Sequence, residues 1–484
     1  MSIRERCRRT STVRFSRASN LTTGQVYSAV IAKERRGDYL GGTIQVIPHI
    51  TNEIKSRIRL ASGQHESGVV ICEVGGTVGD IEGQAFLEAI RQLRREVGRA
   101  NVLNIHVTLL PQLGATGELK TKPTQQSVRE LRSVGLQPDV IVCRAETEIP
   151  EDIRDKIALF CDVEPQAVIG VTTAETIYEV PLMLEEAGLG RLVAKQFGLQ
   201  EEPDLADWSR LVDRIKKPRS SIKIALVGKY VELHDAYMSV SESLKHAAWH
   251  NDVNVEIVWL NSESLSTEDL KKELRKVSGI LVPGGFGPRG IEGKISAVTF
   301  AREKKIPFLG ICYGLHMAVI EVARNLLGLE GANSSEIDPE TPYPVIDLMP
   351  DQHGVEMGGT MRLGLWPCKL EPGTVAAKAF ACDTVQERHR HRFEVNNDYR
   401  QRLDDVGLIV SGASPDGQLA EVMELRDHPW FVGIQSHPEF LSRPNRPHPL
   451  FREFIRAANE TLPEGAQRSL PLDQPHQLRE AIAH

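Results

Sequence analysis

The sequence predicts an α/β protein with two doubly wound, mostly parallel sheet domains. Short runs of Val, Ile and Leu alternate with amphipathic helical stretches from Gly24 to about Gly198. A second alternating block begins at Lys223, and the charged, proline-containing stretch 199–221 separates the two blocks. Because strand–helix alternation implies right-handed crossovers, each block is expected to form its own parallel sheet.

The composition fits this class and excludes several others. The chain has 484 residues, of which 41% are hydrophobic and 25% charged, so it is neither disordered nor fibrous. A formal net charge of −7 argues against a nucleic-acid partner held by bulk electrostatics. No apolar run approaches the ~20 residues of a membrane span, so no membrane partner is expected. Seven cysteines without a C-x-x-C pair indicate a reducing, cytoplasmic location.

The first block, residues 19–200, contains four apolar runs that are typical of strands buried on both faces. These runs are Val69–Val74, Leu103–Leu110, Val140–Cys143 and Ala167–Val171. Between them lie helical patterns at 84–97, 124–134 and 151–162. A linker at 201–221 follows, with one short helix expected around Trp208.

The second block, residues 222–460, repeats the alternation. Strands are expected at Lys223–Val227, Val255–Leu260, Gly279–Val282 and Phe308–Ile311, and helices at 239–250, 267–276 and 293–304. After residue 330 the pattern changes to strands punctuated by Gly and Pro, at Thr360–Leu365, Leu408–Ser411, Leu419–Leu425 and Phe431–Ser436. The polar stretch 461–484 is expected to be a frayed tail.

The strongest chemical signal is the segment IPFLGICYGLHMAVIE at 306–321. A buried strand ends at Gly310, and Cys312 follows before Gly314 opens a helix. Glycines on both sides permit the strained turn of a nucleophile elbow, which projects a side chain above the sheet edge. The helix N-terminus favours the thiolate. A lone cysteine is usually a structural core residue, but this context indicates a nucleophile.

Two further segments supply groups that a thiolate needs. In WFVGIQSHPEF at 430–440, His437 and Glu439 are two residues apart, so an extended backbone places both on one side and the carboxylate can orient the imidazole. In LVPGGFGPRG at 281–290, the backbone N–H groups of Gly284 and Gly285 could form an oxyanion hole. Taken alone, each segment would more often be a surface histidine or a plain βα turn.

These three segments, in this order, resemble the class I glutamine amidotransferase domain, and the resemblance covers 222–460. It implies glutamine hydrolysis through a thioester on Cys312, with His437 as base and Glu439 as the acid that orients it. The helix start Tyr313, Gly314, Leu315 and His316 would bind the substrate. His316 departs from the pattern, since the family usually has Gln there; backbone binding remains possible, and a solvated helix histidine is the alternative.

Four other segments resemble CTP synthase. They are TTGQVYSAVIAKERRGDYLGGTIQVIPHITNEIK at 22–55, ICEVGGTVGDIE at 71–82, GELKTKPTQ at 117–125 and ERHRHRFEVNN at 387–397. Together with the amidotransferase domain they cover about 19–460. The resemblance implies a P-loop-like synthetase domain that converts UTP to CTP: ATP phosphorylates the uracil 4-oxygen, and ammonia from glutamine displaces the phosphate.

The resemblance also assigns roles in the synthetase domain. Glu73 follows a predicted strand and would bind Mg²⁺, which takes few protein ligands beside phosphate oxygens. The contacts with UTP or CTP would come from Asp80, Ile81, Glu82, Lys120, Thr121, Lys122, Pro123, Thr124, Gln125 and Lys156. Ammonium groups at a helix N-terminus suit a triphosphate. Taken alone, such a loop is usually a solvated charged turn, and acids after a strand are often helix caps.

In the amidotransferase domain, Arg392 and Glu336 match the family's contacts with glutamine. A guanidinium suits the α-carboxylate of the substrate, and a carboxylate suits its α-ammonium group. The basic run 388–392 could otherwise be a nucleic-acid patch, but no other basic segment accompanies it.

Residues 1–18 match none of these motifs. Compared with the family pattern, the sequence lacks a first strand, a glycine-rich phosphate loop with a lysine, and a metal-binding Asp. Six arginines within 1–17 resemble a transit peptide, but a wrongly chosen start is the favoured interpretation. We therefore expect impaired use of ATP by this chain.

The sequence thus favours a glutamine-hydrolysing CTP synthase that forms a homotetramer, takes ATP and UTP as substrates with Mg²⁺, and is activated by GTP. Two alternatives are a stand-alone glutaminase and a non-catalytic regulatory or assembly subunit. The intact Cys312, His437 and Glu439 disfavour the subunit without catalysis. The segments at 71–82 and 117–125 disfavour the stand-alone glutaminase, which would not use them.

Overall fold

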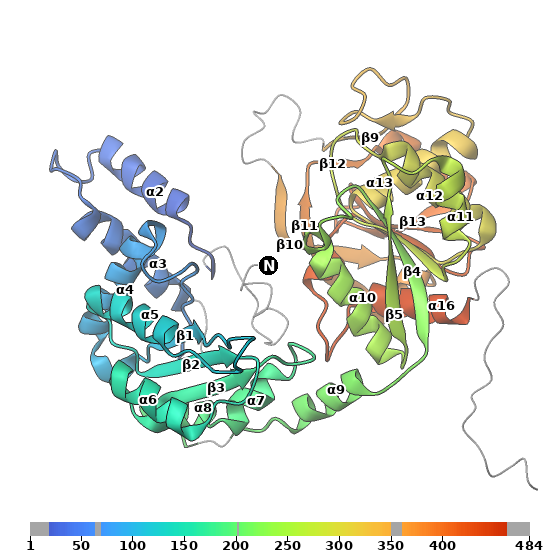
Figure 1. The fold of residues 1–484 in the computed structure, drawn as a ribbon. Coiled ribbons are helices and arrows are strands. Elements are labelled where there is room, and N and C mark those ends of the chain that lie inside the picture. Colours follow the sequence, from blue (N-terminus) through green and yellow to red (C-terminus); the bar gives the residue numbers. More distant parts are fainter. Residues whose placement is uncertain (1–18, 63–68, 201–202, 350–360, 462–484) are drawn as a thin grey trace, which may run out of the picture. The chain divides into compact units, whose positions relative to one another are not determined.

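The computed structural model describes residues 19–62, 69–200, 203–349 and 361–461 (Figure 1). The chain divides into two compact units, with the boundary between Lys216 and Lys217. The predicted linker helix is α9 (Ala206–Lys216), and it belongs to the smaller unit rather than between the two. Its Trp208 donates a hydrogen bond from Nε1 to the carbonyl of Tyr178, 2.7 Å away. The tail 462–484 and segment 1–18 lie outside the described residues.

The smaller unit contains a three-stranded parallel sheet in the order β1 (Ile105–Leu109), β2 (Val140–Ala145), β3 (Val168–Thr172). Helices α5 and α6 cover one face of this sheet, and α7 and α8 cover the other. A separate apolar cluster joins α2, α3 and α4. The helices are α2 (Thr23–Arg35), α3 (Thr51–Ser62), α4 (Gln84–Val97), α5 (Lys122–Ser133), α6 (Glu151–Cys161), α7 (Val180–Glu186) and α8 (Leu189–Phe197).

The predicted strand Val69–Val74 is wrong for this structure, because no strand forms at these positions. Val69, Val70 and Ile71 are exposed, Ile71 at 90%, and Val74 is half-buried. A strand needs the hydrogen bonds of a neighbour, and β1 pairs only with β2 within the described chain. Alternate residues of β1 are exposed, with Val107 and Leu109 each 63% exposed.

The larger unit is built on a nine-stranded sheet in the order β11-β10-β13-β14-β15-β7-β6-β4-β5. The half from β15 to β5 is parallel, and the half from β11 to β15 is antiparallel. The strands are β4 (Ser221–Gly228), β5 (Asn254–Asn261), β6 (Gly279–Val282), β7 (Phe308–Ile311), β10 (Arg362–Leu370), β11 (Thr384–His391), β13 (Leu408–Ala413), β14 (Ala420–Leu425) and β15 (Phe431–Ile434). A second sheet has the order β12 (Phe393–Val395), β9 (Pro344–Leu348), β8 (Asn333–Ser334).

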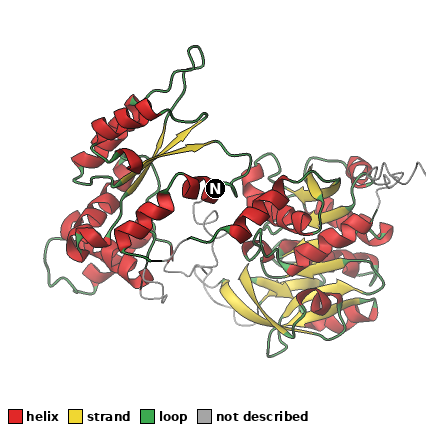
Figure 2. Ribbon diagram, turned by 90° about the horizontal axis from the view of Figure 1, so that it is seen from below, coloured by secondary structure: helices red, strands yellow, loops and turns green. Residues whose placement is uncertain are grey.

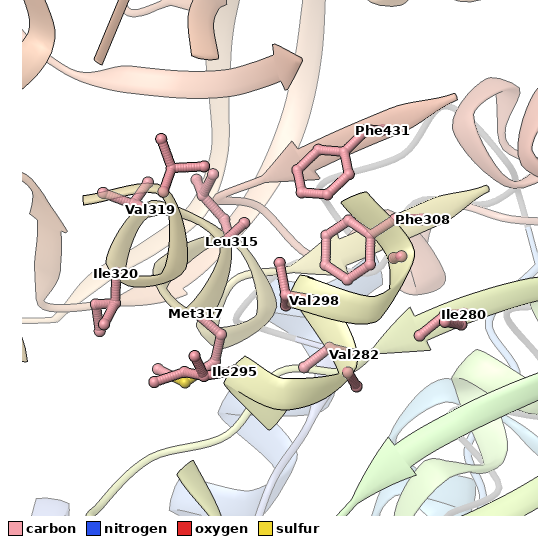
Figure 3. Close-up of a cluster of buried hydrophobic side chains, with 14 of the residues drawn as sticks. Ile280, Val282, Ile295, Val298, Phe308, Leu315, Met317, Val319, Ile320 and Phe431 are labelled. Atoms are coloured by element: carbon pink, nitrogen blue, oxygen red, sulfur yellow. The ribbon is translucent and has the colours of Figure 1, made fainter. Parts of the chain in front are cut away.

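Helices cover both faces of the nine-stranded sheet (Figure 2). On one face α11, α12 and α13 pack on β6, β7 and β15, where Phe308, Leu315 and Phe431 meet (Figure 3). On the other face α10, α14 and α16 form a second apolar layer. The helices are α10 (Met238–His250), α11 (Thr267–Leu274), α12 (Ile291–Lys304), α13 (Tyr313–Asn325), α14 (Val375–Phe380), α15 (Arg400–Asp405) and α16 (Pro449–Glu460). Burial on both faces explains the continuous apolar runs of the central strands.

No helix within the described ranges is both long enough and apolar enough to cross a bilayer.

Candidate active site

Three adjacent parallel strands of the larger unit end at the same edge of the sheet. In β6 and β7, Val282 pairs with Gly310, and in β7 and β15, Ile311 pairs with Ile434. The segments that follow these strands therefore meet, although they lie far apart in the sequence. The edge at the carboxyl ends of parallel strands is where α/β sheets bind ligands.

The segment after β7 forms the predicted elbow. Cys312 has φ +48° and ψ −99°, which is a strained conformation for a side-chain-bearing residue, and it caps α13. Only glycine fits on either side: a Cβ on Gly314 would lie 2.1 Å from the carbonyl oxygen of Val282, and one on Gly310 would lie 2.7 Å from the backbone of Gly314. The buried thiol is thus held at the start of a helix.

The segment after β15 brings His437 and Glu439 to the thiol. His437 Nδ1 lies 2.7 Å from Glu439 Oε1, and the His437 backbone N–H donates to the Arg388 carbonyl on β11. Burial would lower the pKa of His437. The charges of Glu439 and Cys312, with hydrogen bonds to both, instead raise that pKa well above its usual value. The arrangement therefore favours the imidazolium form of His437.

The glycine segment after β6 is the third segment that lies beside Cys312. A Cβ on Gly284 would lie 2.8 Å from His437 Cε1 and 3.7 Å from Cys312 Cβ, so this position must be glycine. Gly285 lies against the ring of Tyr313. The Tyr313 hydroxyl donates to the Gly287 carbonyl at 2.6 Å, which ties the glycine segment to α13.

The two residues predicted to contact glutamine lie beside the small sheet. Glu336 follows β8, and Arg392 lies between β11 and β12. Glu336 Oε1 accepts a 3.0 Å hydrogen bond from the Gly287 N–H, so the carboxylate also holds the glycine segment. Burial raises the pKa of Glu336, although this hydrogen bond and the charge of Lys229 oppose the rise. The site therefore brings together a thiol, an imidazole, backbone N–H groups and two carboxylates.

The structure corrects the alternative of a solvated His316 and adds a residue that sequence reasoning missed. His316 is buried, and its Nε2 lies 2.9 Å from Oε1 of Gln435. The Nε2 of Gln435 lies 3.7 Å from Cys312 Sγ. Gln435 is a polar residue directly after an apolar strand, and the sequence shows this signal. Its position beside Cys312 follows only from the pairing of β7 and β15.

The predicted nucleotide contacts of the smaller unit lie in exposed loops and at a helix start. Asp80 Oδ2 accepts a 3.0 Å hydrogen bond from the Thr77 N–H, which folds the turn from Gly75 to Asp80. Ile81 and Glu82 are exposed in a short 3₁₀ turn before α4. Glu73 is exposed as well, and partial desolvation raises the pKa of its carboxyl.

The segment KTKPTQ opens α5. Lys122 begins the helix, Pro123 occupies its first turn, and no side chain caps the N-terminus. Thr121 and Thr124 are buried and fix the start of the helix, whereas Lys122 and Lys156 are exposed. Other contacts are local: Gln125 donates to Thr121 Oγ1 at 3.0 Å, and Lys120 pairs with Glu118 at 2.7 Å.

The donor set near Glu73 is compatible with Mg²⁺ but does not form a cage. Among the described residues, no group of three or more His, Cys, Asp or Glu side chains is placed to hold a metal ion. Mg²⁺ bound to nucleotides usually takes one or two carboxylates, with phosphate oxygens and water completing the shell. A single exposed carboxylate meets that requirement.

Two family models match separate parts of the chain. A family model described as CTP synthase N-terminus matches residues 6–199, which includes most of the segment 1–18 that the sequence motifs left unmatched. A model described as glutamine amidotransferase class-I matches residues 232–457. The glutaminase domain of Trypanosoma brucei CTPS, solved with bound acivicin, is 36% identical, with a TM-score of 0.48, covering 50% of this chain and 94% of that one.

Full-length relatives cover more of the chain. The CTP synthase of Thermomicrobium roseum is 67% identical over 462 residues, which are 95% of this chain and 84% of the relative. The CTP synthase of Roseiflexus castenholzii is 63% identical over 465 residues, with 96% and 84% covered.

Taken with the fold, the elbow cysteine and its His–Glu pair define the larger unit as a class I glutamine amidotransferase. The whole chain belongs to the CTP synthase family. Members are glutamine-dependent ligases that aminate UTP to CTP in pyrimidine biosynthesis.

Proposed function

We propose that the larger unit releases ammonia from glutamine through a thioester on Cys312 and that the smaller unit uses this ammonia to aminate UTP. The observation that supports the proposal most directly is the closeness of Cys312, His437 and Gly284 at the ends of three adjacent strands. These groups match what acyl transfer to a thiol requires.

In the proposed reaction the Cys312 thiolate attacks the side-chain amide carbon of glutamine. The N–H groups of Gly284 and Gly285 stabilise the oxyanion, and the His437 imidazolium gives its proton to the departing nitrogen, so that ammonia leaves. Water then attacks the thioester while His437 takes a proton, and glutamate and the free thiol are released. Glu439 keeps the imidazole oriented and stabilises its positive charge.

Substrate binding would use both ends of the glutamine backbone. Arg392 would pair with the α-carboxylate and Glu336 with the α-ammonium group. Tyr313, Gly314 and Leu315 would bind the side-chain amide at the start of α13. The hydrogen bond from Gly287 to Glu336 supports this role, because it holds the carboxylate beside the glycine segment.

In the smaller unit, the exposed N-terminus of α5 and the ammonium groups of Lys120 and Lys122 would bind the triphosphate of UTP. Asp80, Glu82 and Lys156 would complete the nucleotide contacts. Mg²⁺, held by Glu73 and phosphate oxygens, would neutralise charge that develops during phosphoryl transfer from ATP. GTP is the proposed activator, and the cytoplasm is the proposed location.

We also propose a homotetramer. The segment 22–55 exposes several large apolar side chains, namely Tyr27, Ile31, Leu40, Val46 and Ile47. Such a concentration of exposed apolar groups is typical of an interface. Light scattering of the purified chain checks this proposal, since particles of only 53.8 kDa at micromolar concentration, with and without UTP, would contradict it.

The proposed function is tested with Cys312→Ala and two nitrogen sources. We expect loss of glutamine hydrolysis and of glutamine-dependent CTP formation, while CTP formation from ammonium chloride stays at the level of the unmodified chain. Cys368→Ala, at another buried cysteine of the larger unit, is the matched control and should retain both activities. Glutamine hydrolysis that persists in Cys312→Ala would overturn the thioester assignment.

A further inference from the structure

A buried amide, that of Gln435, touches the nucleophile, and the mechanism proposed above does not use it. Ile311 pairs with Ile434, so Cys312 and Gln435 are the first residues beyond two adjacent parallel strands. The Cys312 N–H donates to the Ile434 carbonyl at 2.6 Å, which fixes the two segments side by side. Gln435 is fully buried, and its Nε2 lies 3.7 Å from Cys312 Sγ.

His316 holds the other end of this amide. It lies four residues after Cys312, one turn further along α13, and so shares a helix face with the nucleophile. Its Nε2 lies 2.9 Å from Gln435 Oε1, and both side chains are buried. Burial lowers the pKa of His316 to about 4, against a smaller rise from the hydrogen bond with Gln435, so the imidazole is neutral at cytoplasmic pH.

The hydrogen-bonding requirements of the neutral imidazole decide which way the amide points. His316 Nδ1 is buried and has no partner among the described residues. A proton on Nδ1 would leave a buried N–H without an acceptor, which costs more than an unsatisfied lone pair. The proton therefore belongs on Nε2, which donates to the carbonyl oxygen Oε1. The amide N–H₂ group of Gln435 is then turned toward the sulfur.

We propose that Gln435 donates a hydrogen bond to the Cys312 thiolate and that His316 is the positioning residue that keeps the amide in this orientation. The inference deepens the proposed function, on which it rests for the role of the thiolate. It also gives a purpose to histidine at position 316, where the family usually has glutamine. Either residue can donate a hydrogen bond to the amide oxygen of Gln435. Position 316 therefore needs a hydrogen-bond donor rather than an imidazole.

Other groups near the sulfur can titrate, and the test must leave them unchanged. His437 and Glu439 approach from the segment after β15, and Glu394 approaches from β12. From β11, His389 and His391 lie near His437 and His316 respectively. Replacing the uncharged amide of Gln435 by another uncharged side chain adds no charge beside these groups. A change in thiolate formation would then report the hydrogen bond itself.

The experiment measures alkylation of Cys312 by iodoacetamide from about pH 5 to 9, resolved by mass spectrometry of the Cys312 peptide. Peptide resolution is needed because Cys72 and Cys382 are exposed and react as well. In Gln435→Met, which keeps the side-chain volume but has no donor, we expect the midpoint of the pH profile to rise by about one unit, roughly a tenfold loss of thiolate below the midpoint. An unchanged midpoint would overturn the proposal.

His316 is tested by a pair of variants. His316→Leu removes the donor to Oε1 and frees the amide to rotate, so the midpoint should rise by part of the Gln435→Met shift. His316→Gln restores a donor and should return the midpoint to that of the unmodified chain. Equal shifts in both variants would show that the histidine only fills space. His428→Gln is the matched control, because His428 is a buried histidine at the opposite end of β15 that bonds the Ala301 carbonyl, and its midpoint should not move.

The proposed function and this inference fail in different ways. If the unmodified chain does not release ammonia from glutamine, the proposed function is wrong, whatever the alkylation profile shows. If it releases ammonia but the Gln435→Met and His316→Leu profiles coincide with that of the unmodified chain, only this inference is wrong. Should Gln435→Met fail to fold, the same prediction is carried by the pair His316→Leu and His316→Gln, which removes and restores the donor to the Gln435 amide without adding a charge beside the sulfur.

Discussion

The candidate sites of the two units are built in opposite ways. In the larger unit, Cys312, His437 and Gly284 are packed against one another before any ligand arrives. In the smaller unit, Glu73, Asp80 and Lys122 are exposed; Asp80 accepts a hydrogen bond from the nearby Thr77 N–H, and the Lys122 ammonium lies 5.7 Å from the ring centroid of Phe160. The site of the larger unit depends on strand pairing and close packing. The exposed charged groups of the smaller unit would instead be ordered by the ligand that they bind.

This difference predicts where each site is vulnerable. Side chains that define a packed site are also part of the core, so changing one alters both activity and stability. Exposed charged groups can be changed without disturbing the fold, and their loss should appear only when nucleotide is added. Four changes test this contrast, from the largest expected effect to the smallest.

The largest effect is expected for Gly314→Ala. The new Cβ would lie 2.1 Å from the backbone carbonyl oxygen of Val282, so α13 must move away from β6 and carry Cys312 with it. We expect glutamine hydrolysis to fall by a factor of about 10² or more, since an error of about 1 Å in placement has that cost. Gly24→Ala is the control, because a Cβ at that position would meet no heavy atom within 4 Å, and it should hydrolyse glutamine normally. A Gly314→Ala protein with full activity would refute the close packing of the elbow.

A smaller but still large effect is expected for Glu439→Gln. The amide keeps the shape but removes the charge that helps to raise the pKa of His437. We expect glutamine hydrolysis to fall by about 10²-fold, because the imidazolium loses its stabilising partner. The pH profile of hydrolysis should also show His437 losing its proton at lower pH than in the unmodified chain. Unchanged kinetics across the pH range would remove Glu439 from the site.

A third effect concerns stability in acid. Burial lowers the pKa of His316 and of His428 to about 4, so in the unfolded chain both bind protons at higher pH than in the folded one. Their contribution to stability is present above the unfolded pKa of about 6.5 and is lost as pH falls toward 4. Other buried groups act in both directions. His389 and His391, whose pKa values burial lowers, add to this trend. Glu336, Glu394 and Glu421, whose pKa values burial raises, and His437, whose pKa is raised by Glu439 and Cys312, oppose it.

We therefore expect His316 and His428 each to cost the larger unit stability as pH is lowered from about 6.5 to 4. His428→Gln should remove about 3 kcal/mol of this loss, since it deletes one of the histidines. Denaturant unfolding at several pH values, followed by Trp fluorescence, measures the slope. A slope equal to that of the unmodified chain would mean that His428 is not neutral and buried in the folded state.

The smallest effect on the fold is expected for Lys120→Ala. Lys120 pairs with the exposed Glu118, and surface pairs of this kind contribute little. Without nucleotide, the melting temperature should equal that of the unmodified chain. With UTP, the stabilisation given by bound nucleotide should shrink, which a thermal shift titration measures. A lower melting temperature in the absence of UTP would contradict the contrast between the two sites.

How much the sequence could predict follows the same division. The strands Gly279–Val282 and Phe308–Ile311 were predicted with their observed bounds, because central parallel strands are apolar on both faces. The strained turn at Cys312 was predicted from the glycines on either side of it. Val69–Val74 has the same apolar character, yet it forms no strand, since composition cannot tell whether a partner is present.

Other features depended on distant parts of the chain. The basic run 388–392 was recognised for its arginines, but residues 384–391 form β11, and Arg388 holds the backbone of His437. Gln435 was missed because its role arises from the pairing of two strands, and no local pattern reports that pairing. Candidate residues within one segment could therefore be predicted from the sequence. The contacts that distant strands add around Cys312 could not.

The pairing of β7 with β15 has a consequence for the time at which activity appears. Cys312 and Gln435 are 123 positions apart, and β15 is the last strand of the unit among the described residues. Contacts between such distant residues form late, because a long loop must close before they stabilise the chain. During synthesis the thiol is made long before its base, and it meets that base only after the final strand has left the ribosome. We therefore expect that a growing chain cannot hydrolyse glutamine before β15 and His437 have been synthesised. Ammonia is then not released by an incomplete unit.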